Sequence, residues 1–202
     1  MKKYFFLPIL FLFSMSSIHS QSFNGGINAG ITVSQIAGDG MAGYNKAGLY
    51  GGFFVQYFVN QSSSLQMELS YIQKGSARSE NPNDPTIFQY LRRLNYIELP
   101  LIFQYHLRPL IFEAGLSADF LAGSFEESNY QLMNQNDLWR KVTLNTIFGI
   151  KYVLNDNWMV SIRTVNSINS IRNNSVPFNV RRYTRSYGEF NDVLVFGLSY
   201  KF

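Results

Sequence analysis

The chain has 202 residues, a length that suits one domain, and only 15% of them are charged, against about 25% in an average soluble domain. Its formal charge of +4 at pH 7 is too small an excess to indicate a nucleic-acid-binding surface. The chain contains no Cys, which argues against both a disulfide-stapled secreted domain and a lipoprotein.

The N-terminal segment has the features of a secretory signal. Lys2 and Lys3 precede an apolar run over residues 4–13 that is too short to cross a bilayer, and a mostly small and polar stretch follows. We interpret residues 1–20 as a signal peptide that is cleaved before Gln21, which leaves residues 21–202 as the mature domain. The alternative, an N-terminal membrane anchor, is disfavoured because the apolar run ends so soon.

The mature chain contains eight runs that alternate apolar and polar residues, each long enough to cross a bilayer as a tilted strand. In chain order they cover residues 25–36, 47–59, 65–75, 94–106, 110–122, 140–154, 158–168 and 191–202. The second run is ambiguous, because Tyr50 and Phe54 make its inner face unusually aromatic. In the fourth run, Pro100 cannot donate to a sheet ladder and predicts a bulge or a local break in pairing. The last run ends on Phe202, which we expect the barrel-assembly machinery to recognise during insertion.

The connections between these runs alternate in length. Those after the second, fourth and sixth runs are short, and the others are longer and polar, which is typical of a barrel with periplasmic turns and external loops. The predicted fold class is therefore all-β, an eight-stranded antiparallel up-and-down transmembrane β-barrel, present as a monomer in the bacterial outer membrane. The alternative, a soluble β-sandwich or lipocalin-like barrel, requires the apolar faces to point inward.

Three segments carry a resemblance to a known family. They are Gly-Leu-Tyr-Gly-Gly-Phe at residues 48–53, the run at residues 65–75 and Tyr-Ile-Glu-Leu-Pro-Leu at residues 96–101. The chain resembles the PorT-like outer-membrane β-barrel family over nearly the whole mature sequence. This resemblance implies the barrel fold and, for the PorT branch, an accessory role in type IX secretion with secretion-system proteins as partners.

Charged residues within the strands predict a polar lumen. If the apolar faces look at lipid, nine charged side chains project inward: Glu68, Lys74, Glu98, Glu113, Asp119, Lys141, Lys151, Arg163 and Lys201. Isolated buried charges are very costly, so we expect these side chains to pair in an internal network. An eight-stranded barrel is only wide enough inside for side chains to fill, which favours a plugged lumen. The alternative is a narrow channel, with these charges forming a path for ions or a proton relay.

Arginines and aromatic residues outside the lumen suggest contacts with lipid. Seven arginines in or beside the external loops could bind lipopolysaccharide phosphates: Arg78, Arg92, Arg93, Arg172, Arg181, Arg182 and Arg185. A dedicated protein or ligand site is the alternative for this cluster. Aromatic residues near the strand ends predict two interfacial girdles, with Tyr57, Phe58, Tyr105, Tyr152 and Trp158 on the periplasmic side and Trp139, Tyr183 and Tyr187 outside.

The sequence gives little support to catalysis. His106, which is the one His of the mature chain, is expected at the periplasmic end, whereas a lipid hydrolase or acyltransferase would need its base near the outer leaflet. The chain has no Gly-Xaa-Ser-Xaa-Gly, no phosphate loop and no metal-spaced His or Cys set. We therefore expect a structural or accessory barrel without enzymatic activity, cofactor or metal, and keep a lipid-modifying enzyme as an alternative.

Overall fold

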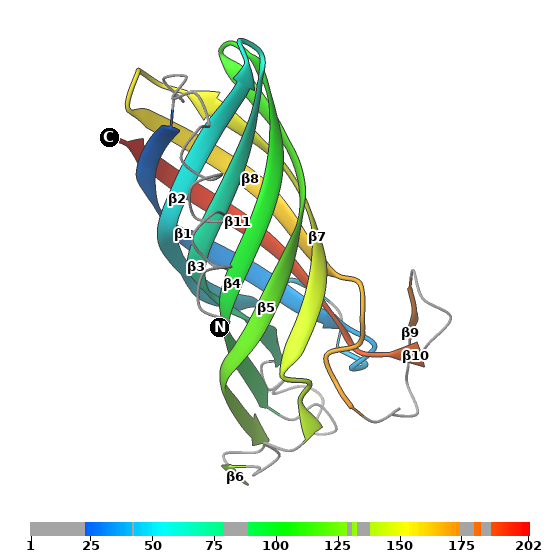
Figure 1. The fold of residues 1–202 in the computed structure, drawn as a ribbon. Coiled ribbons are helices and arrows are strands. Elements are labelled where there is room, and N and C mark those ends of the chain that lie inside the picture. The colour runs from blue at the N-terminus through cyan, green and yellow to red at the C-terminus, as the bar shows by residue number, and fades with distance from the viewer. Residues whose placement is uncertain are drawn as a thin grey trace, which may run out of the picture.

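Eight long antiparallel strands form a closed barrel, as the alternating runs predicted (Figure 1). The computed structural model describes residues 23–41, 43–78, 89–128, 131–132, 138–173, 180–182 and 187–202, so the predicted signal peptide lies outside the described residues. The long strands are β1 (Phe23–Ala37), β2 (Lys46–Asn60), β3 (Ser63–Arg78), β4 (Tyr90–Leu107), β5 (Leu110–Ser128), β7 (Val142–Val153), β8 (Trp158–Ser167) and β11 (Phe190–Lys201). Three two-residue strands lie in the longer connections: β6 (Gln131–Leu132), β9 (Val180–Arg181) and β10 (Tyr187–Gly188).

The barrel closes because the first and last strands pair. The ladder between β1 and β11 runs from Gly26 opposite Lys201 to Ala37 opposite Phe190, and every other long strand pairs with its neighbours along the chain. A closed ladder satisfies the backbone hydrogen bonds that hydrocarbon cannot satisfy. Among the described residues, no helix is long and apolar enough to cross a membrane.

The short and long connections lie at opposite ends of the barrel (Figure 1). Two residues separate β2 from β3, the cis-linked Arg108 and Pro109 separate β4 from β5, and residues 154–157 separate β7 from β8. The C-terminus lies at this short-turn end, where the N–H of Phe202 donates to the Gly25 carbonyl over 2.9 Å. We take this end as periplasmic and the opposite end as external.

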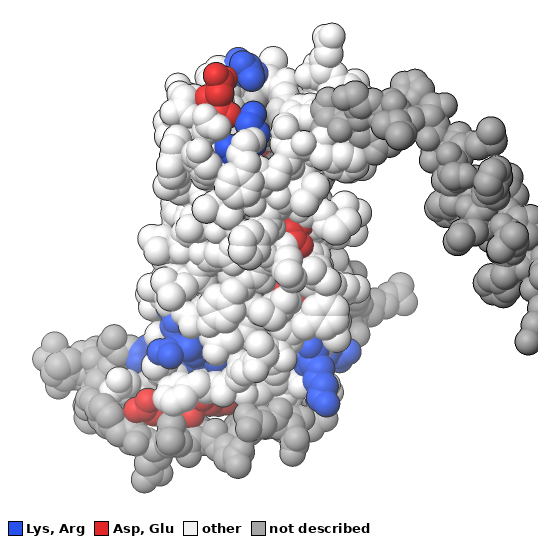
Figure 2. All heavy atoms as spheres, turned by 60° about the vertical axis from the view of Figure 1, so that its left-hand side comes forward, with Lys and Arg blue, Asp and Glu red and all other residues white. Residues whose placement is uncertain are grey.

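The apolar face of each strand points outward. Leu116 is 59% exposed and Phe148 is 56% exposed, whereas Glu113 and Lys151 are 3% and 1% exposed. Figure 2 shows Lys and Arg near the two ends of one face. The wide band between them is almost entirely uncharged, with only a small acidic area. The soluble alternative, which needs the opposite orientation, is therefore excluded.

The lumen is less hydrophilic than the sequence suggested. The two aromatic residues on the ambiguous face of β2, Tyr50 and Phe54, are both buried inside. Tyr50 belongs to a buried apolar cluster drawn from almost every strand: Ile36, Tyr50, Ile72, Leu94, Tyr96, Ile102, Trp139, Ile147, Val165, Ile171, Val193 and Val195. A lumen this narrow is packed like a protein core, so apolar side chains serve there as well as polar ones.

Two irregularities interrupt the ladders of β4. The β3 pairs jump from Met67 opposite Leu101 to Ser70 opposite Glu98, so the pairing breaks at Pro100, as its missing N–H predicted. On the other side, Asn95 pairs with Gly123 but Tyr96 pairs with Leu121, which leaves Ala122 as an extra residue in a β-bulge of β5.

Candidate functional site

A buried ion network crosses the middle of the lumen. Arg163 on β8 contacts Glu68 on β3, with Nη2 and Oε1 2.8 Å apart, and Glu113 on β5, with Nε and Oε2 2.5 Å apart. Lys151 on β7 lies 3.1 Å from Glu113 Oε1, and the Tyr50 hydroxyl on β2 donates to Glu68 over 2.8 Å. All five side chains are buried, so this central network joins walls of the barrel that are far apart in the sequence.

Strand register explains how the network assembles. Glu113, Gly149 and Arg163 lie directly beside one another on β5, β7 and β8. A Cβ atom at position 149 would lie 2.7 Å from Arg163 Cγ and 3.0 Å from Glu113 Oε2. The missing side chain of Gly149 therefore lets the carboxylate and the guanidinium meet across the strand between them.

A second ion group, the Lys74 group, consists of Lys74, Glu98 and Asp119. Glu98 and Asp119 lie directly opposite each other on β4 and β5, an arrangement that is unfavourable for two carboxylates. Lys74 Nζ lies 2.7 Å from Asp119 and 3.8 Å from Glu98, and the Ser117 hydroxyl donates to Glu98 over 2.8 Å. The lysine thus offsets the repulsion between the two acids.

Uncharged polar side chains continue the central network toward the periplasmic end. The Gln104 amide donates to Glu113 over 2.7 Å, and Gln56 donates to Gln104 over 2.6 Å. Ser64 Oγ lies 2.7 Å from His106 Nε2, but this hydroxyl is fully buried and also hydrogen-bonded to Gln104. The geometry is that of an imidazole packed into a polar layer rather than of an accessible nucleophile and base.

The structure brings together seven of the nine charges expected in the lumen: Glu68, Lys74, Glu98, Glu113, Asp119, Lys151 and Arg163. The prediction is wrong for Lys141, which is exposed just before β7 begins, where the strand alternation no longer applies. Lys201 is half-buried at the periplasmic rim, where its N–H donates to the Asn157 carbonyl, and does not join the central network.

The external end of the lumen holds a cluster that the sequence did not indicate. This mouth cluster consists of Arg92, Glu126, Trp139, Arg172 and Glu189. Arg92 lies 3.1 Å from Glu126 and 2.9 Å from Glu189, and Arg172 Nε also lies 2.9 Å from Glu189. The guanidinium carbons of Arg92 and Arg172 lie 4.9 Å and 4.6 Å from the centre of the Trp139 ring. One indole therefore lies within cation–π distance of both guanidinium groups.

The mouth cluster corrects two predictions. Arg92 is buried and Arg172 is mostly buried against carboxylates, so neither reaches lipid phosphates as expected, and Trp139 is 2% exposed rather than part of a girdle. Arg92 lies on the same inward face of β4 as Glu98, six residues away, and this spacing could have identified Arg92 as a lumen residue. Burial raises the pKa of the Glu189 carboxyl above its ordinary value, although Arg92 and Arg172 lower it.

The remaining arginines of the predicted lipid cluster are scattered. Arg78 donates to the Gly40 carbonyl over 2.9 Å, Arg182 pairs with Asp192 over 2.7 Å, and the Arg93 guanidinium lies 5.7 Å from the Phe125 ring. Arg185 and the side chain of Arg181 lie outside what the structure describes. The seven arginines thus do not form one surface within the described part of the chain.

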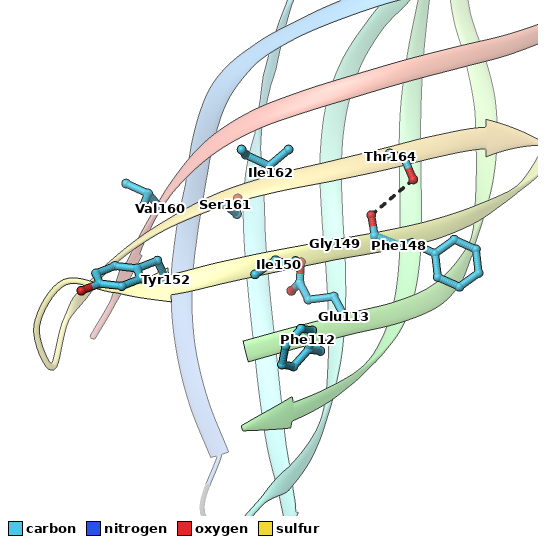
Figure 3. A pocket seen from close by; sticks show the side chains of 10 residues that line it. All are labelled: Phe112, Glu113, Phe148, Gly149, Ile150, Tyr152, Val160, Ser161, Ile162 and Thr164. Atoms are coloured by element: carbon cyan, nitrogen blue, oxygen red, sulfur yellow. Dashed lines mark hydrogen bonds between the residues drawn. The ribbon is translucent and has the colours of Figure 1, made fainter. Parts of the chain in front are cut away.

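A groove of about 650 Å³ lies on the outer wall over β5, β7 and β8 (Figure 3). Its sides are outward-facing apolar residues, among them Phe112, Phe148 and Ile162, and Glu113 and Gly149 lie at its floor. Because the groove faces the hydrocarbon, it has the character of a lipid-facing depression rather than of an aqueous site. Within the described residues, no group of three or more His, Cys, Asp or Glu side chains could hold a metal ion.

Comparisons with known proteins agree with this geometry. The sequence matches the family model described as outer membrane protein beta-barrel domain over residues 15–173. Neisserial surface protein A has a similar structure, with a TM-score of 0.52, 12% identity, and 89% of this chain and 97% of that one covered. The attachment invasion locus protein Ail of Yersinia pestis, solved with the heparin analogue sucrose octasulfate, gives a TM-score of 0.51, 12% identity and coverage of 89% and 99%. At such identities the likeness is one of fold. No curated protein matches the chain in sequence.

Proposed function

Because the chain belongs to the outer membrane protein beta-barrel domain family, and so to the bacterial outer membrane, we propose that it is a plugged barrel with a structural or accessory role. The observation that carries this proposal is the central network, in which Arg163 contacts both Glu68 and Glu113 across the lumen. A continuous water-filled path would have to displace these contacts and solvate charges that are now paired within the protein. The mouth cluster supports the same reading at the external end, where two ion-paired arginines lie beside a buried indole.

Conductance separates a plugged barrel from a narrow channel. Refolded protein in a planar bilayer should give no steady conductance, because side chains fill the lumen. The double variant Glu113→Ala with Arg163→Ala removes both side chains of the ion pair at the middle of the central network. We expect this variant to show stepwise single-channel currents. A folded state of both proteins is checked by heat-modifiable migration in gels. Steady ohmic conductance of the unaltered protein would contradict the plugged barrel and favour the narrow channel.

An accessory role in export is the second candidate, and the resemblance of residues 65–75 and 96–101 to the PorT-like family supports it. In this role the barrel would act with secretion-system proteins of a type IX assembly. Deletion of the gene should leave exported cargo in the periplasm, and a plasmid copy should restore release. Normal cargo release in the deletion strain would end this candidate.

We propose that the protein does not catalyse lipid modification. The burial of Ser64 and its bond to Gln104 support this proposal, since the Ser64 and His106 pair is then closed to a lipid ester. An overexpressing strain should keep an unchanged lipid profile, and His106→Ala should make no difference to it. Altered lipids that revert in the His106→Ala strain would contradict the proposal.

The proposed route to the membrane has two further parts. Removal of residues 1–20 would leave a mature chain starting at Gln21, which intact mass measurement of the purified protein tests directly. Phe202 is 73% exposed at the short-turn end, and this exposure suits recognition by the barrel-assembly machinery. Phe202→Ser should therefore slow insertion in cells while leaving refolding in detergent unchanged.

A further inference from the structure

A concave site of about 640 Å³ opens in the outer wall where β5 and β7 separate at the external end. We call it the β5–β7 notch. Its lining includes Phe120, Leu121, Ala122, Gly123, Lys141 and Val142. Lys141 is the residue that the alternation wrongly assigned to the lumen, and its exposure at this notch leaves it without a role in the barrel interior.

The notch follows from the strand pairing. The β5–β7 ladder ends with Phe120 opposite Val142, and a bond of 2.9 Å from the Leu121 N–H to the Lys141 carbonyl follows it. Beyond that point β5 continues to Ser128, whereas β7 has not yet begun. The bulge at Ala122 also bends β5 there, since a bulge kinks its strand and increases the local twist. One edge of β5 is therefore left uncovered by β7 next to the bend.

The chemistry of the notch changes with height. Phe120 and Val142 are 43% and 42% exposed, and both belong to the apolar outer faces of their strands, at the external ends of the β5–β7 ladder. Lys141 follows directly on the external side, and Ser124 adds a hydroxyl to the lining. An apolar lower wall with a cation above it matches an amphiphile that has an anionic headgroup and lies in the outer leaflet.

We propose that the β5–β7 notch binds a phosphorylated lipid of the outer leaflet, with an acyl chain against Phe120 and Val142 and a headgroup phosphate on Lys141. This inference rests on the proposed role as an outer-membrane barrel, and it places a phosphate contact on a residue outside the predicted arginine cluster. The apolar outer faces of β5 and β7 end at Phe120 and Val142, so we place the notch at the outer boundary of the hydrocarbon, where lipid of the outer leaflet is the occupant that it meets.

Native mass spectrometry of the folded protein in detergent, titrated with hexa-acylated lipid A, tests the site. Lys141→Gln should weaken binding about tenfold, as expected for loss of one hydrogen bond to a charged group. Ala122→Trp should fill the notch and weaken binding without changing the charge. The matched control is Arg108→Gln, which removes an exposed cation at the periplasmic turn and should leave binding unchanged.

Four outcomes decide the proposal. Equal binding of dephosphorylated lipid A would overturn the phosphate contact, and complete competition by millimolar inorganic phosphate would overturn the acyl contact. If Lys141→Gln and Ala122→Trp bind lipid A as tightly as the unaltered protein does, the notch is not the binding site. Unaltered protein that retains no lipid A would instead overturn the proposed lipid partner, while the conductance result would stand.

Discussion

Among single residues, Glu113 has the most demanding surroundings. Its two oxygens contact Arg163, Lys151 and Gln104 within 3.1 Å, all in a fully buried setting. Glu98 is buried to a similar degree, but its nearest cation, Lys74, lies 3.8 Å away and is held more closely by Asp119. Two glutamates in the same lumen should therefore differ in what their charge contributes to stability.

Replacing each glutamate by the neutral isostere tests this difference. Glu113→Gln should lower the free energy of unfolding by about 3 kcal/mol, because Arg163 and Lys151 lose a shared counterion inside the barrel. Glu98→Gln should cost about 1 kcal/mol or less, because Ser117 can still donate to the amide oxygen. Urea unfolding in lipid vesicles, followed by Trp fluorescence, measures both variants. Equal losses would show that the central network does not depend on Glu113.

At the scale of the strand, the bilayer determines which face is apolar. On β7, Phe148 and Ile150 face lipid while Gly149 and Lys151 face the lumen, and the same alternation holds along the membrane-facing part of each long strand. This pattern positions the lumen charges and explains why they could be read from the sequence. It also means that a charge on the outer face should be most costly at mid-depth.

Phe148→Arg should therefore destabilise the barrel by about 2–4 kcal/mol, the usual cost of an arginine on the lipid face near the midplane. Leu107→Arg provides the matched control, because Leu107 is also exposed and apolar but lies beside the short β4–β5 turn. Its cost should be about 0–1 kcal/mol. The same urea titration in vesicles compares the two, and similar losses would contradict the assigned membrane depth.

Strand positions could be predicted from the sequence, but their external ends could not. All eight runs became strands, yet β4 begins at Tyr90 instead of residue 94 and β5 continues to Ser128 instead of residue 122. Arg92 and Arg93 looked like loop residues although burial alternates along β4 from Tyr90, and Glu126 lies beyond the bulge that interrupts the alternation of β5. Their pairing is a property of the β4–β5 ladder, in which Arg92 lies directly opposite Glu126. For the same reason Trp139 was read as an interface anchor, although the site that buries it is assembled from four separate segments.

For the molecule as a whole, the mouth cluster ties the external connections to the barrel wall. Arg92 comes from β4 and Glu126 from β5, whereas Trp139, Arg172 and Glu189 come from two connections that are distant in sequence. Cation–π contacts of desolvated arginines contribute about 1–2 kcal/mol each, so the indole should matter more to the connections than to the barrel.

Trp139→Ala should loosen the external connections without opening the barrel. Limited trypsin digestion should cut faster at Arg140 and Arg172, while heat-modifiable migration of the folded protein persists. Tyr44→Ala is the control, since Tyr44 is an exposed aromatic residue of the β1–β2 connection outside the mouth cluster. Unchanged cleavage in Trp139→Ala would show that the ion pairs suffice to hold the connections.

The placement of Arg163 also protects the fold against a common error of β-sheets. If β8 slid by one residue against its neighbours, every side chain on it would change faces, and this guanidinium would enter the acyl chains while Ile162 took its place among the acids. Such a misaligned barrel would expose a cation to hydrocarbon and take the guanidinium away from the buried carboxylates of Glu68 and Glu113. The surrounding lipid therefore disfavours barrels with a shifted strand register, which backbone hydrogen bonding alone would allow.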